Sequence, residues 1–135
     1  MSKGTNKNTS VGTVRLIQEI GPKINWNTKE NKQLLEAVLA LKNADEAKRF
    51  LRDLMTEDEI REFANRLEAA SLLSRDVQYN AISESTGLSS TTIARISKWL
   101  KGSLGGYRLV LSRLSNSSLH HHNSSKLRKG LSLST

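Results

Sequence analysis

Residues 79–100, YNAISESTGLSSTTIARISKWL, decide the fold of this 135-residue chain. Gly87 marks the point where the chain leaves one helix and enters the next, because a residue without a Cβ adopts a positive φ at little cost. Ile82 lies five residues before this glycine, and Ile93 and Ile96 lie six and nine residues after it. That spacing predicts two short helices crossing at about 90–120°, with Ile82 pointing inward from the first and Ile93 and Ile96 lining the inner face of the second. We interpret the segment as a helix-turn-helix, with an ordinary helical hairpin as the simpler alternative.

The second of these helices begins with a run of short hydroxyl side chains. Leu88 fills the turn, and Ser89 or Ser90 can cap the helix. Hydroxyls at the start of a helix in the major groove can donate to base acceptors, and a Thr methyl can touch a thymine methyl. Arg95 and Lys98 lie one helical turn apart, a spacing that suits the flanking phosphates. The predicted DNA-binding residues are Asn80, Ser89, Ser90, Thr91, Thr92, Arg95, Lys98 and Lys101.

The charge distribution points to the same part of the chain. Lys and Arg number 21 against 13 Asp and Glu, which gives a formal net charge of +8. Acids outnumber bases in residues 31–70, whereas no acid follows Glu84. A segment without acids does not repel a phosphate backbone, and its cations release counterions when it binds nucleic acid. We apply that interpretation to residues 85–114, while for residues 115–135 a solubilising tail explains the charge equally well.

Three more helices are predicted before this segment, each from a cap followed by an apolar stripe at helical spacing. The expected caps are Asn27 or Thr28 for the first helix, Asn43 for the second and Thr56 for the third. Glu46 and Glu59 follow the second and third caps by three residues, as in a capping box. The stripes are Leu34, Leu35, Val38, Leu39 and Leu41; then Phe50, Leu51, Leu54 and Met55; then Ile60, Phe63, Ala64, Leu67 and Ala70.

Composition excludes several classes of protein. Only 36% of the residues are hydrophobic and 4% aromatic, so we expect a small helical unit that completes its core by dimerising. The absence of cysteine excludes disulfides, thiol nucleophiles and thiolate zinc sites. No apolar run approaches the ~20 residues of a membrane span, and the polar start resembles no signal peptide, so a cytoplasmic protein is expected. His120 to His122 lack nearby acidic ligands, so we predict no metal site.

Residues 28–114 resemble the Trp repressor superfamily, most closely its YerC/YecD-type branch. The resemblance is carried by LLEAVLALKNADEAKRFLRDLMTEDEI, ANRLEAASLL, AISESTGLSSTTIARISKWLKG and GGYRLVLSRL. It implies an all-α fold and an intertwined homodimer in which the first helices of each subunit wrap around the other. It also implies a helix-turn-helix at about 78–100 and a closing helix at about 104–114. The expected organisation is an N-terminal arm (1–26), this domain (27–114) and a basic low-complexity tail (115–135).

The founding member of that family uses tryptophan as a corepressor, and the resemblance places a remnant of that pocket here. Arg66 and Arg95 match its basic residues. The residue after the second arginine is a glycine in the tryptophan-binding member but is Ile96 here, and three positions further Trp99 replaces a small hydroxyl residue. Two bulky side chains would occupy the ligand's space. We therefore predict no response to tryptophan and no cofactor, although Trp99 could equally be plain core.

The leading hypothesis is a sequence-specific, dimeric regulator of transcription that binds double-stranded DNA, expected to act as a repressor. The alternative is a nucleic-acid-binding or nucleoid architectural protein without sequence choice, although few aromatics are present to stack on single-stranded bases. An enzyme is not expected. The sequence contains no Ser-His-Asp set, no Gly-rich phosphate loop and no cluster of His and carboxylate residues.

Overall fold

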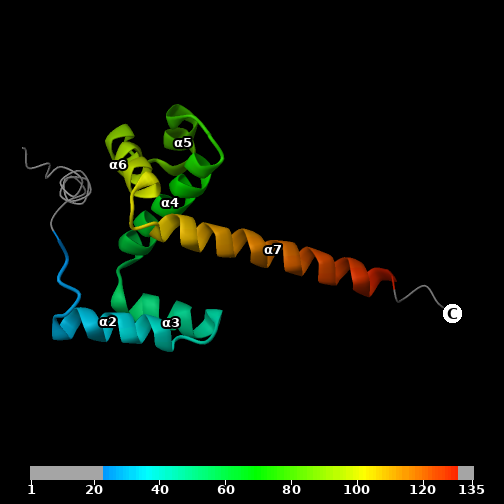
Figure 1. The fold of residues 1–135 in the computed structure, drawn as a ribbon, viewed down its shortest axis with the longest axis horizontal. Helices are drawn as coiled ribbons and strands as arrows, with labels where there is room; N and C mark the ends of the chain where they lie inside the picture. The colour runs from blue at the N-terminus through cyan, green and yellow to red at the C-terminus, as the bar shows by residue number, and fades with distance from the viewer. Residues whose placement is uncertain (1–22, 131–135) are drawn as a thin grey trace, which may run out of the picture. The chain divides into compact units, whose positions relative to one another are not determined.

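The computed structural model describes residues 23–130, with side chains as far as Ser118 in the last helix. This part of the chain contains helices and no strand, which confirms the expected all-α class. The helices are α2 (Lys29–Ala40), α3 (Ala44–Leu54), α4 (Glu57–Ser74), α5 (Tyr79–Thr86), α6 (Ser90–Lys101) and α7 (Gly106–Gly130) (Figure 1). The chain divides into two units, residues 1–65 and 66–135. Residues 1–22 of the predicted N-terminal arm (1–26) lie outside the described residues.

The predicted caps are present at the starts of α2 and α3. Thr28, rather than Asn27, caps α2, and its hydroxyl accepts from the Asn31 N–H at 3.2 Å. Asn43 caps α3 and accepts from the Glu46 N–H at 3.0 Å. The Glu46 carboxylate accepts in turn from the Lys42 N–H at 2.8 Å, one residue before the cap. Backbone donors that would otherwise lack partners at both helix starts are thereby satisfied.

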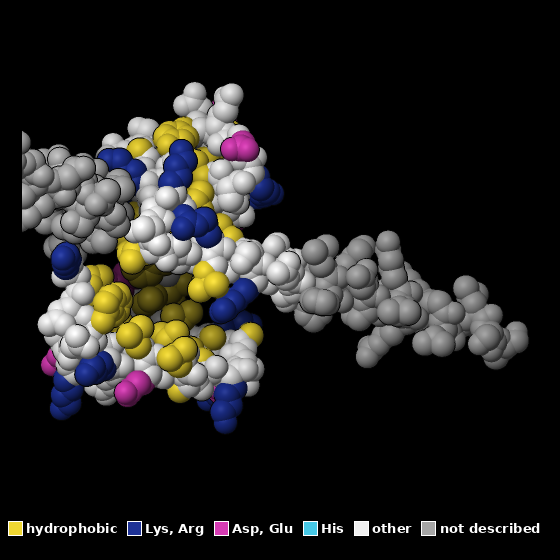
Figure 2. All heavy atoms as spheres, viewed as in Figure 1, with side chains coloured by type: hydrophobic (Ala, Val, Ile, Leu, Met, Phe, Trp, Pro, Cys, Tyr) yellow, Lys and Arg dark blue, Asp and Glu magenta, His cyan; other side chains and the backbone are white. Residues whose placement is uncertain are grey.

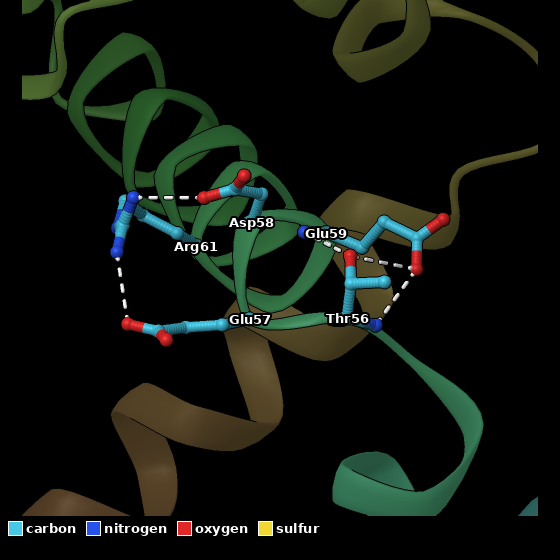
Figure 3. Close-up of polar contacts among 5 residues, drawn as sticks. All are labelled: Thr56, Glu57, Asp58, Glu59 and Arg61. Atoms are coloured by element: carbon cyan, nitrogen blue, oxygen red, sulfur yellow. Dashed lines mark hydrogen bonds and ion pairs between the residues drawn. The ribbon is translucent and has the colours of Figure 1, made fainter.

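The start of α4 is a complete capping box (Figure 3). The Thr56 hydroxyl accepts from the Glu59 N–H at 3.2 Å, and the Glu59 carboxylate accepts from the Thr56 N–H at 2.9 Å. Arg61 forms ion pairs with Glu57 and Asp58, each at 3.0 Å, and all three side chains are exposed. Exposed pairs of this kind contribute about 0.2–1 kcal/mol each. The acids here therefore serve the helix start and its dipole.

The first unit leaves much of its apolar surface exposed. Helices α2 and α3 bury no residue, although both are amphipathic. Hydrophobic side chains gather over these two helices in the view of Figure 2. The large exposed apolar residues of α2 and α3 are Leu34, Leu35, Val38, Leu39, Leu51 and Leu54. Monomeric proteins rarely expose apolar residues so close together, so this face is a candidate for contact with another chain.

The second unit contains the buried core. Its members come from three successive helices: Ala69 and Ala70 of α4, Ile82 of α5, and Ile93 and Ile96 of α6. The two alanines are fully buried and let the helices approach closely. Partly buried residues packed against this core are Leu72, Leu73, Val77, Leu88, Tyr107 and Leu111. The inward positions predicted for Ile82, Leu88, Ile93 and Ile96 are confirmed.

Helix α7 extends well beyond the end predicted for it. The resemblance placed a closing helix at about 104–114, but α7 continues to Gly130 and includes much of the segment assigned as a tail. No Gly or Pro interrupts residues 107–129. The serines along it bond back to their own helix, for example Ser112 to the Leu109 carbonyl at 2.8 Å and Ser115 to the Ser112 carbonyl at 2.9 Å. Across residues 23–130, no helix is long and apolar enough to span a membrane.

Candidate nucleic-acid interface

The turn between α5 and α6 has the geometry that the sequence predicts. Gly87 caps α5 in the left-handed conformation at φ 73°, and its N–H donates to the Ser83 carbonyl at 2.8 Å. A Cβ added at Gly87 would meet no atom within 4 Å. The glycine is therefore required by the backbone conformation and not by a lack of space.

Two hydroxyl groups that were not predicted as turn residues hold this turn. Thr86, only 8% exposed, donates to the Ile82 carbonyl at 2.7 Å and accepts from the Leu88 N–H at 3.3 Å. Ser83 donates to the Leu88 carbonyl at 2.8 Å. Both backbone groups of Leu88 are therefore bound by side chains of α5. The available signal was that hydroxyl residues lie one and four positions before the turn glycine. Side chains at such positions can bind backbone groups of the turn that have no backbone partner.

The four hydroxyl residues at the start of α6 form two pairs that differ in their hydrogen bonds. Ser89 is the cap, and its hydroxyl accepts from the Thr92 N–H at 3.2 Å and lies 3.0 Å from the Thr92 hydroxyl. This pair is occupied by local contacts. Ser90 and Thr91 are exposed, and their side chains form no hydrogen bond among the described residues. The second pair is therefore available to an external partner.

The cationic residues predicted for DNA binding lie on the exposed side of α6. Arg95, Lys98 and Lys101 are exposed, and none forms an ion pair with a described carboxylate. The opposite side of α6 is buried through Ile93, Ile96, Ser97 and Leu100. Asn80 is exposed in the first turn of α5. Helix α6 thus carries the predicted hydroxyl and cationic residues on a face separate from the core.

The four residues assigned to the remnant ligand pocket do line one hollow. It has a volume of about 570 Å³, and its walls include Arg66 of α4 together with Arg95, Ile96 and Trp99 of α6. The remaining lining residues are Leu67, Thr92, Leu104, Gly106, Tyr107 and Val110. Ile96 is 3% exposed and belongs to the core, whereas Trp99 is half-buried. In a single chain these two side chains therefore border the space and leave part of it open.

Tyr107 of α7 also lies on this hollow. Burial raises the pKa of its hydroxyl above the ordinary value, and the positive charge of Arg66 offsets part of that rise. The hydroxyl is therefore neutral at physiological pH. No group of three or more His, Cys, Asp or Glu residues suited to a metal occurs among the described side chains, which do not include those of His120 to His122.

Comparison with known proteins gives a consistent set of matches. The model of the family described as Trp repressor protein matches residues 29–115. The uncharacterized protein YerC of Bacillus subtilis is 38% identical over 86 residues, which are 64% of this chain and 83% of that protein. A crystal structure of a TrpR-like protein from Eubacterium eligens is 38% identical with a TM-score of 0.62, covering 67% of this chain and 93% of that one. A putative Trp repressor from Staphylococcus aureus is 27% identical with a TM-score of 0.63, covering 69% and 96%.

Proposed function

This chain belongs to the Trp repressor family, and we propose that it is a sequence-specific repressor that binds double-stranded DNA as a homodimer through its helix-turn-helix. One observation supports DNA binding above the others. The exposed face of α6 begins with two unoccupied hydroxyl residues, Ser90 and Thr91, and continues with Arg95 and Lys98, which no described carboxylate neutralises. In a major groove this order places the hydroxyls against base edges and the cations against phosphates.

The roles of the α6 residues follow from their contacts. Because Ser89 and Thr92 bind one another, they fix the start of the helix and present its free N–H groups to a phosphate. Ser90 and Thr91 contact the bases. Lys98 and Lys101, together with Asn80 on α5, contact the backbone and supply affinity that does not depend on sequence.

Two exposed apolar surfaces support the homodimer. The first is the face of α2 and α3, where Val38 is 52% exposed and Leu39 is 83% exposed. The second is a hollow of about 1050 Å³ within the second unit, lined by α4, α6 and α7 and including Leu67, Leu111 and Leu114. Removing apolar surface from water yields about 25 cal/mol per Å², so two copies that cover these faces gain a shared core. Sedimentation equilibrium is expected to give a dimer, and a monomer at micromolar concentration would contradict this proposal.

We also propose that DNA binding does not depend on tryptophan. Ile96 and Trp99 stand where the resemblance places a glycine and a small hydroxyl residue, so they take up part of the ligand's space even though the hollow stays partly open. We expect the operator affinity to be the same with and without tryptophan. Calorimetry that detected micromolar tryptophan binding would overturn this expectation.

The competing function is an architectural protein that binds nucleic acid without sequence choice. The net charge of +8 and the absence of acids after Glu84 favour binding to any duplex. Selection of preferred duplexes from a random pool, followed by competition against bulk DNA, separates the two functions. A regulator is expected to prefer its selected duplex by about 10³-fold or more. A pool that yields no enriched sequence would favour the architectural protein.

A further inference from the structure

The guanidinium of Arg108, in the first turn of α7, contacts the end of α6. Its Nη1 donates to the main-chain carbonyl of Leu100, which lies in the last turn of α6. The last four carbonyls of a helix have no partner within it, and a cation is favoured there by the helix dipole. Leu100 itself belongs to the buried residues of α6. Arg108 therefore gives the C-terminal end of α6 a charged partner that comes from another helix.

The connection between α6 and α7 is shaped around the same side chain. Gly105 has φ 67°, and a Cβ added to it would lie 3.0 Å from Arg108 Nη2, 3.6 Å from Cζ and 3.8 Å from Nε. The guanidinium thus lies against Gly105, in space that any other residue would occupy. The Gly105 carbonyl accepts from the Leu109 N–H at 3.0 Å and so begins α7. The arginine, the glycine and the start of α7 form one local arrangement.

We propose that Arg108 is a positioning residue that fixes the orientation of α6 relative to α7, and that it thereby sets the half-site spacing the dimer accepts. This inference rests on the proposed function. Helix α7 contributes Leu111 and Leu114 to the hollow that we assign to the dimer, while α6 carries the residues assigned to DNA. The α6–α7 connection is therefore the route by which the dimer sets the distance between its two α6 helices. Without the Arg108 contact, the apolar packing of Tyr107 and Leu111 against the core would remain, but it would leave α6 freer to turn relative to α7.

Spacing tolerance distinguishes positioning from simple stabilisation. Moving one half-site by a single base pair rotates it by about 35° around the duplex, because B-DNA has about 10–10.5 base pairs per turn. A dimer with a fixed α6 orientation loses affinity for the shifted site, and we expect at least a tenfold loss, roughly the cost of a mismatched base pair. A dimer whose α6 pivots accepts both sites. A loss of folded protein alone would lower both affinities equally.

The experiment compares the selected duplex with versions whose half-sites are one base pair closer or farther apart. The full chain is tested with Arg108→Met, and Arg113→Met is the matched control, since Arg113 is an exposed cation on the same helix. Arg108→Met is expected to reduce the spacing penalty to less than about threefold, while Arg113→Met keeps the full tenfold penalty. The preferred bases within each half-site are expected to stay the same in both variants.

Two further variants keep the test decisive if Arg108→Met does not fold. Gly105→Ala places a Cβ 3.0 Å from Arg108 Nη2 and also strains the backbone at φ 67°, so it is expected both to relax the spacing and to lower the free energy of unfolding. Arg108→Lys keeps a donor for the Leu100 carbonyl and is expected to restore most of the wild-type penalty. If the wild-type protein selects no duplex with two half-sites at a defined spacing, the proposed function fails and this inference fails with it. If wild type requires one spacing and Arg108→Met behaves like Arg113→Met, the inference alone is overturned.

Discussion

Replacing Thr86 with valine tests whether a buried hydroxyl holds the turn of the helix-turn-helix. Valine has nearly the shape of threonine, so the substitution removes the hydroxyl without leaving a cavity. The lost contacts are the 2.7 Å bond to the Ile82 carbonyl and the 3.3 Å bond from the Leu88 N–H. A hydrogen bond contributes about 0.5–1.5 kcal/mol net, and the longer bond falls at the low end of that range. We therefore expect a loss of about 1–2 kcal/mol in the free energy of unfolding.

Urea denaturation at one fixed protein concentration measures this loss, because the stability of a dimer depends on concentration. Thr91→Val is the matched control, since Thr91 is exposed and forms no hydrogen bond among the described residues. Amide hydrogen exchange gives a local measurement, because the Leu88 N–H loses its acceptor only in Thr86→Val. The reasoning is refuted if Thr86→Val changes stability by no more than the ~0.5 kcal/mol typical of surface substitutions and leaves Leu88 exchange unchanged.

Three other predictions address the interface and the hollow. Thr91→Ala is expected to change the preferred base at one position, at a cost of about 1–3 kcal/mol in competition binding; an unchanged preference and affinity would contradict the docking of α6. Lys98→Ala is expected to weaken binding to selected and random duplexes alike. Because the proposed dimer carries two copies of Lys98, the slope of log affinity against log salt is expected to fall by about 1.8, whereas a loss limited to one sequence would argue against a phosphate contact. Burial raises the pKa of Tyr107, so the folded state resists ionisation and loses stability as the pH rises above the ordinary tyrosine pKa. Tyr107→Phe is expected to lack that alkaline loss in urea titrations, and an identical pH dependence in both proteins would contradict the assignment.

The features that the sequence predicted well are those with local causes. The starts of α2, α3 and α4 follow from caps whose partners lie three residues away, as at Thr56 and Glu59. The turn between α5 and α6 follows from Gly87 and its flanking isoleucines, which lie at a fixed spacing. In both cases the interaction that determines the structure connects residues close in sequence. One amino-acid sequence is therefore enough to predict these features.

The features that the sequence missed depend on packing or on polar residues that satisfy one another. The end of α7 differs from the predicted one because the Ser- and Asn-rich composition of residues 115–125 favours a tail, whereas no Gly or Pro stops the helix before Gly130. Thr86 was overlooked because its role appears only when the turn is built. The hollow beside α6 also depends on packing, because Ile96 belongs to the core and lines the hollow at the same time.

The contacts at the start of α6 limit how much sequence discrimination one protomer supplies. Ser89 and Thr92 bind each other, so Ser90 and Thr91 are the hydroxyl residues available to bases. At the low end of about 1 kcal/mol per base contact, one protomer discriminates by about 2 kcal/mol, while a 10³-fold preference needs about 4 kcal/mol. Two protomers supply that amount only when both α6 helices reach their half-sites together. In the proposed homodimer, specificity therefore depends on the spacing between the two α6 helices as much as on the residues that touch the bases.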